Sequence, residues 1–195
     1  GDPESFNTTD NVLPIGEDGE AITALAVLED VLLIFKRTAM YALSGTSPGS
    51  WQVVPLDLSV GCASAQSMGT FGGRLFFMSL KGPRALSSPG AGVSDICTPL
   101  VGNLFDSAAV DESDLVNSVI VGNPNQQYVA WAITPTGDTT NTVMIPFNYT
   151  LDRWMSSGWD VVDVKSCTLV NDNLGRAWPM IADYGGYVYR LGVGT

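Results

Sequence analysis

The chain repeats itself at an offset of 43 residues, measured from Val31 to Arg74. The segments Val31–Lys36 and Met40–Ser44 align with Arg74–Ser79 and Pro83–Ser87. The aligned segments contain four identical pairs: Leu32/Leu75, Ala42/Ala85, Leu43/Leu86 and Ser44/Ser87. Self-similarity at a fixed period is typical of folds built from stacked units that share a core. The chain therefore has to place at least two similar units next to each other.

Each copy of the repeat reads as short strands joined by tight turns. The first strand is expected at Ala21–Leu28 in one copy and at Ala65–Phe71 in the other. Glu29-Asp30 and Gly72-Gly73 follow these strands, and such residue pairs suit hairpin turns that need positive φ. Trp51–Pro55 reads as a fourth, outer strand of the first copy. Four antiparallel strands repeating near every 43 residues are typical of one β-propeller blade, which spans roughly 40–50 residues.

The pattern returns later in the chain with longer loops. Strands are expected at Val116–Val121, Gln127–Ile133 and Thr142–Tyr149, and a further unit begins near Ser166. We therefore expect an all-β, propeller-like array of about four antiparallel blades in a single domain, 1–195, with approximate blades 12–60, 61–100, 116–160 and 161–195. Because about four blades is near the minimum for closure, an open fragment of a larger propeller is the alternative.

Two parts of this organisation stay open at the level of sequence. The region between Leu86 and Val116 reads as a long loop, an insertion with a short helix around Ser107 to Leu115, or a degenerate strand. The chain begins with Gly1 and not with Met, so we expect it to be part of a longer chain.

Charge and composition exclude several functions. The net charge is −11, which disfavours sequence-specific binding to DNA or RNA but fits an acidic wall that DNA passes without sticking. The chain has no histidine, so Ser-His-Asp and Cys-His mechanisms and His-ligated zinc are excluded. Charged residues make up only 15% of the chain, which indicates that part of the surface is covered by another subunit or by the rest of a longer chain.

No catalytic, cofactor-binding or metal-binding residue is assigned, and we expect no cofactor and no enzymatic activity. The three cysteines, Cys62, Cys97 and Cys167, form no CxxC pair and are interpreted as small buried side chains. Two acidic clusters are interpreted as solvated turns: Asp111, Glu112 and Asp114, and Glu17, Asp18 and Glu20. A glycoside hydrolase is the third hypothesis, and it requires two carboxylates about 5–10 Å apart in a pocket.

The tryptophans distinguish a scaffold from a glycan-binding module. Five are present, and we expect them to anchor blade packing, one per unit; four or more in one exposed groove would instead favour sugar binding. Asn171–Trp178 resembles the Asp-box hairpin of sialidase-like propellers, with Gly175 and Trp178 in register but asparagine at 171 and 173. We interpret this segment as a turn before a strand that buries Trp178.

A family resemblance covers roughly residues 1–90. It is carried by six segments: Gly1–Phe6, Ile22–Leu25, Leu32–Lys36, Met40–Gly45, Val60–Ser67 and Gly73–Ser79. Together they resemble bacteriophage tail and neck proteins with propeller domains, most like the tail nozzle or hub of short-tailed phages. Lys81-Gly82 departs from the family's aspartate-glycine, and beyond residue 90 only the ending from Asn148 to Trp154 is typical.

The resemblance implies a virion structural protein: a subunit of a tail nozzle or neck that scaffolds the DNA exit channel. It implies location in the virion tail and a homo-oligomeric ring, with neighbouring tail and portal proteins as partners. Passing DNA would be contacted non-specifically at most. No membrane and no small-molecule substrate is expected. The alternative is a carbohydrate-binding or host-recognition propeller module.

Overall fold

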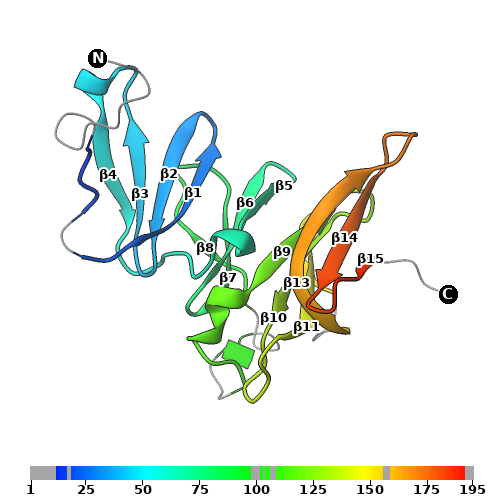
Figure 1. The fold of residues 1–195 in the computed structure, drawn as a ribbon. Helices are drawn as coiled ribbons and strands as arrows, with labels where there is room; N and C mark the ends of the chain where they lie inside the picture. The colour runs from blue at the N-terminus through cyan, green and yellow to red at the C-terminus, as the bar shows by residue number, and fades with distance from the viewer. Residues whose placement is uncertain are drawn as a thin grey trace.

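The computed structural model describes residues 12–16, 19–97, 102, 104–105, 109–155 and 159–191. Strands dominate these residues and form three antiparallel sheets that follow one another in chain order (Figure 1). The predicted all-β class is confirmed. Within the described ranges the sheets make an open row and do not close into a barrel or ring.

The first sheet is a four-stranded antiparallel meander. Its strands, in spatial order, are β1 (Ile22–Leu28), β2 (Val31–Lys36), β3 (Met40–Ser44) and β4 (Gln52–Asp57). The turn between β1 and β2 consists of Glu29 (φ 49°) and Asp30 (φ 63°), the two-residue geometry that matches the twist of the flanking strands. The sequence predicted this turn at these residues.

The second sheet repeats the same meander. Its strands are β5 (Gly69–Phe71), β6 (Arg74–Ser79), β7 (Gly82–Leu86) and β8 (Ser94–Asp95). β5 is shorter than the predicted strand, because residues 65–67 form the 3-10 turn η2 (Ala65–Ser67). The Ser64 hydroxyl accepts from the Gln66 backbone amide and the Ser67 hydroxyl donates to the Ser64 carbonyl at 2.7 Å, which holds this turn. β8 lies in the region that the sequence left open.

The third sheet has seven strands and contains the rest of the described chain. The strands are β9 (Val119–Asn123), β10 (Tyr128–Ile133), β11 (Asn141–Asn148), β12 (Arg153–Trp154), β13 (Trp159–Asn171), β14 (Ala177–Asp183) and β15 (Val188–Arg190). The predicted strand at Val116–Val121 begins only at Val119, since the 3-10 turn η3 (Asp114–Asn117) precedes it. The ranges 116–160 and 161–195, expected as two blades, contribute strands to one hydrogen-bonded sheet.

The long strand β13 explains this continuity. It has 13 residues, and its first part pairs with β11 while the part from Val164 onward pairs with β14. The sheet folds over so that its two halves pack face to face: Val164 and Ile181 cover the side chains of Val119, Val121 and other β9–β11 residues. β9 and β10 are consequently buried along their whole length.

The cores lie between neighbouring sheets. Leu33 and Phe35 of the first sheet pack against Leu75 and Phe77 of the second, with the two phenylalanine rings 5.1 Å apart. The opposite face of the second sheet, which includes Phe76, packs against the third sheet in a cluster that also contains Met78, Trp131, Ile145 and Phe147. Each apolar face between two sheets is thus removed from water by its neighbour, as in other stacked-sheet folds.

Candidate functional site

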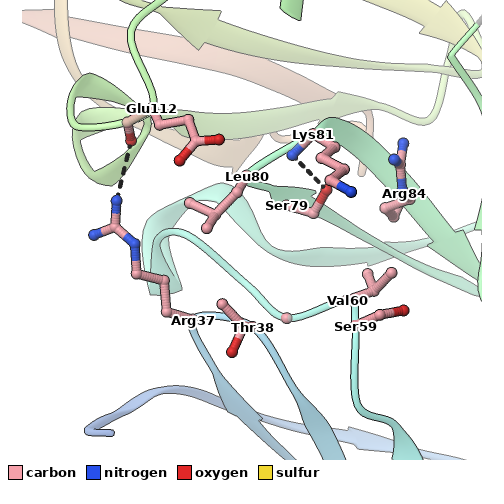
Figure 2. A pocket seen from close by; sticks show the side chains of 10 residues that line it. Arg37, Thr38, Ser59, Val60, Ser79, Leu80, Lys81, Arg84 and Glu112 are labelled. Carbon is pink, nitrogen blue, oxygen red and sulfur yellow. Dashed lines mark hydrogen bonds between the residues drawn. The ribbon is translucent and has the colours of Figure 1, made fainter.

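A small pocket lies where the first sheet, the second sheet and the segment before η3 meet (Figure 2). It encloses about 110 Å³, well below the roughly 300–1,000 Å³ of typical small-molecule sites. It has three cationic side chains and one carboxylate, and its lining consists of Arg37, Thr38, Ser59, Val60, Gly61, Ser79, Leu80, Lys81, Arg84 and Glu112. Three of the nine basic residues of an acidic chain therefore gather in one place.

The polar groups of this pocket are largely engaged in holding the sheets together. Arg37 donates to the backbone carbonyl of Glu112 at 3.4 Å, which ties the β2–β3 turn to the segment before η3 (Figure 2). Arg84 is buried and pairs with Asp95 at 2.7 Å. The Ser79 hydroxyl accepts from the Lys81 amide and donates to the Gly82 carbonyl. With these groups engaged and a volume this small, the pocket is part of the joint between the two sheets.

The acidic clusters singled out in the sequence hold local backbone. The Asp111 carboxylate accepts from the Ser113 amide and hydroxyl, both at 2.9 Å, and these bonds lower the pKa of Asp111. Glu20 accepts from the amide and hydroxyl of Thr38, which fastens the segment before β1 to the β2–β3 turn. Glu17 and Asp18 lie outside the described residues.

One pocket does bring two carboxylates together, at the joint between the second and third sheets. Asp95 and Asp152 both line it, along with Arg74. Asp95 pairs with Arg84 at 2.7 Å and Asp152 pairs with Arg74 at 2.8 Å. Each carboxylate is thus engaged in an ion pair, Asp95 within the second sheet and Asp152 across the joint between the second and third sheets. The arrangement suits a structural ion-pair joint better than hydrolysis.

Of the three cysteines expected to be buried, Cys62 is buried, whereas Cys97 and Cys167 are half-buried. All three are free, and burial raises the pKa of Cys62 and Cys97 to about 11 and of Cys167 to about 12. Their thiols are therefore protonated near neutral pH, whereas only a thiolate is a strong nucleophile or metal ligand.

No group of three or more acidic, cysteine or histidine side chains among the described residues is placed to hold a metal ion. In the same part of the chain, no helix has the length and apolar character needed to cross a bilayer.

The tryptophans are not spread one per unit as expected, because the second sheet has none and Trp131, Trp154 and Trp178 all belong to the third. Trp131 is fully buried between the second and third sheets, and Trp154 lies against it with ring centroids 6.0 Å apart. Trp51 is exposed on the first sheet, and Trp178 is half-buried on β14. These four, the ones whose side chains the structure describes, do not share one exposed groove, so the arrangement expected of a sugar platform is not present among them.

Asp172 is a residue whose role the sequence comparison missed. In the β13–β14 turn its carboxylate accepts from the amides of Leu174 and Arg176, from the Arg176 guanidinium at 2.8 Å and from the Trp178 indole at 3.1 Å. The hydrogen bond from Trp178 is the largest of several that hold the pKa of Asp172 well below its usual range. Comparison with the Asp box placed the expected acid at 173, which is asparagine here, and the neighbouring carboxylate at 172 organises the hairpin instead.

We expect Asp172→Asn to lower the melting temperature at neutral pH, because an amide cannot replace a carboxylate that accepts four hydrogen bonds. A carboxyl whose folded pKa is depressed contributes stability above its ordinary pKa of 3.8 and loses it as the pH falls further. The difference in melting temperature between wild type and variant should therefore shrink on acidification from about pH 7 to about pH 2. Thermal unfolding across this range measures it. Asp163→Asn, which removes a carboxylate at an exposed position of the same strand, is the matched control, and its melting temperature at neutral pH should stay close to that of wild type.

Comparison with known proteins adds no family to this description. No protein-family model matches the chain, and no curated protein matches it.

Proposed function

We propose that the chain is a structural subunit of a virion, with sheets that act as propeller-type blades in the tail nozzle or neck of a short-tailed phage. The observation that carries the proposal is that the residues repeated at an offset of 43 positions serve the packing of the sheets. The pairs Leu32/Leu75, Leu43/Leu86 and Ala42/Ala85 all lie on the apolar faces of sheets, where they serve packing. The conspicuous sequence features thus specify a rigid stack of sheets, which suits a scaffold.

The blade interpretation is supported by the repetition of the packing between sheets. The first and second sheets share strand order and the same antiparallel meander, and the second packs on the third through the face opposite to the one that contacts the first. In a propeller, four-stranded sheets are repeated radially in this way around a channel. The folded-over third sheet supplies two further layers, which accords with about four blades in an open array.

The chemistry of the surface accords with a wall beside DNA. The net charge of −11 would repel the phosphate backbone, so passing DNA would slide along such a wall without being retained. Other copies of the chain and neighbouring tail or portal proteins would be its partners. The resemblance of residues 1–90 to phage tail proteins supports the location in the tail.

Immunogold electron microscopy on virions that carry this gene tests the proposal. Antibodies raised against the chain are expected to label the tail, and mass spectrometry of purified virions is expected to detect its peptides. The purified chain should also leave duplex DNA unretarded in a gel-shift assay at low salt, where electrostatic binding is strongest. Absence from virions, or salt-sensitive DNA retention, would contradict the proposal.

An exposed tyrosine pair keeps a carbohydrate-binding role as the second candidate. Tyr187 and Tyr189 lie on the last hairpin with ring centroids 6.5 Å apart, and Tyr187 is 66% exposed. Such a pair is able to stack on sugar rings. Binding to a glycan array that disappears in Tyr187→Ala would favour this role over the structural one.

A further inference from the structure

The first and the second sheet each contact the next sheet along the chain through the same one of their two faces. Residues of the first sheet that face the second sheet have equivalents, 43 positions later, that face the third sheet: Leu33/Phe76, Phe35/Met78 and Ala42/Ala85. We call this the forward face of a sheet and its opposite side the backward face. Within the described row, the forward face of the first sheet therefore meets the backward face of the second.

The backward face of the first sheet has the same apolar character as that of the second. In the second sheet, Leu75, Phe77 and Leu86 form this face and are at most 1% exposed because the first sheet covers them. Their equivalents are Leu32, Ile34 and Leu43. Strand register extends these into two apolar rows across all four strands: Leu25–Ile34–Tyr41–Pro55 and Val27–Leu32–Leu43–Val53.

No sheet covers these two rows in the described part of the chain. Ile15 packs on their centre, next to Ile34 and Tyr41. On β1, however, Leu25 is 60% exposed and Val27 is 63% exposed. This face is built to the pattern of a buried one and is open to water along β1, which is typical of a protein interaction site.

The opposite end of the row presents an unpaired forward face. Ile181 of β14 faces inward, so its neighbours Met180 and Ala182 face outward, in register with Thr168 and Ser166 of β13. Val170, beside Trp178, and Val188, beside Ala182, belong to the same outer face and are 50% and 65% exposed. This face and the open face of the first sheet lie at opposite ends of the row, so the described sheets of one chain do not cover its own first sheet (Figure 1).

The charges at the two ends are complementary. Glu29 and Asp30 form the β1–β2 turn, close to the Val27–Leu32 pair, and neither has a basic partner among the described residues. Arg190 lies on the outer face of the last layer, beside Met180, and stacks on the ring of Trp178. It has no acidic partner in the described part of the chain. Contact between the two ends places opposite charges at the border of the apolar surface, which favours contact between the two different ends over contact between two identical ends.

We infer that the backward face of the first sheet binds the forward face of the β13–β15 layer of a second copy, head to tail. The inference deepens the proposed scaffold function and rests on its premise of self-assembly. The contact joins two different surfaces, so each chain keeps one free face of each kind, and such contacts continue until they close a ring or extend as a filament. The row of sheets thereby continues from one copy into the next with the same packing direction.

Native mass spectrometry and sedimentation of the purified chain test this contact with two variants that each block one face. Val27→Asp introduces charge into the open rows of the first sheet, and Val170→Asp does so on the last layer. We expect wild type to assemble and each variant alone to remain a single chain. A mixture of the two in equal amounts should restore one contact and stop at a 1:1 dimer. Leu151→Asp, at an exposed turn position away from both faces, is the matched control and should assemble like wild type.

The outcomes separate this inference from the proposed function. Assembly of wild type and of Val27→Asp alike would overturn the head-to-tail contact and leave the scaffold function in place. A mixture that stays monomeric, while wild type assembles, would also overturn it. A wild-type chain that remains single at all concentrations would overturn the contact, and the labelling of virions would then decide the proposed function on its own. Circular dichroism of both variants establishes that they are folded.

Discussion

Replacing Trp131 by alanine should destabilise the chain by about 4 kcal/mol, the range measured for large aromatic residues removed from a core. Trp131 is fully buried and contacts Phe76 of the second sheet and Trp154 of the third, with ring centroids 6.2 and 6.0 Å away. Its indole also donates to the Ser67 carbonyl at 3.1 Å. The substitution therefore opens a cavity between two sheets and leaves a buried carbonyl without its donor, which adds to the cost.

Urea unfolding followed by circular dichroism measures this effect as a shift of the midpoint, and the melting temperature should fall by about 10 °C for a domain of this size. Trp51→Ala is the matched control, because the same side chain is removed from a position that is 45% exposed, and its cost should stay below about 1 kcal/mol. Trp131→Phe should lie between the two, since it keeps a ring but loses the donor. Equal effects of Trp131→Ala and Trp51→Ala would contradict the described core.

Replacing Gly61 by alanine should cost about 3 kcal/mol, at the upper end of typical overpacking effects. A Cβ at this position would lie within 3.0 Å of backbone atoms of Lys36, the last residue of β2, and of Arg37, the first residue of the β2–β3 turn. Backbone atoms cannot rotate away as a side chain can. The segment leading into the second sheet would have to move off the turn and weaken the bond from the Cys62 amide to the Lys36 carbonyl, which is 2.9 Å long.

Gly90→Ala provides the control for this substitution. No atom lies within 4 Å of the methyl group that it would introduce, and Gly90 does not have positive φ. Its effect should stay within about 0.5 kcal/mol of wild type or stabilise slightly, because alanine restricts the unfolded chain. Comparing the urea midpoints of the two variants isolates the cost of the close backbone approach. A neutral Gly61→Ala variant would show that the two sheets do not approach each other there.

Local features of the fold were predictable from the sequence because neighbouring residues decide them. Glu29-Asp30 and Gly72-Gly73 adopt the positive φ values that their positions between two apolar runs indicated. The errors at strand ends are local too. Hydrogen bonds made by the Ser64 and Ser67 side chains hold a 3-10 turn at residues 65–67, so β5 begins only at Gly69. The pattern of apolar residues gives no sign of such side-chain bonds, which compete with the strand for the backbone.

The site residues were predictable only as residue types. Asp172 was visible as an acid in a turn, but its role depends on bringing Trp178 and Arg176 to one carboxylate across a hairpin. The pocket of Arg37, Lys81 and Arg84 joins residues from two sheets, and nothing in their spacing brings them together. Gly61 was noted as part of a family motif, and the reason for a glycine there is a contact with Lys36 and Arg37.

The sequence by itself determined that this chain is all-β and that two of its units, 43 residues apart, are built alike, because strand periodicity and turn residues act over a few positions. Only the tertiary structure decided which side of each repeated unit is covered. Leu75 and its equivalent Leu32 are identical residues in equivalent strands, yet within the described ranges only Leu75 has a sheet packed on it. Burial depends on what comes to lie alongside a strand, and that is a property of the assembled sheets. The repeat thus specifies a face, and the position of its sheet in the row decides whether that face is core or surface.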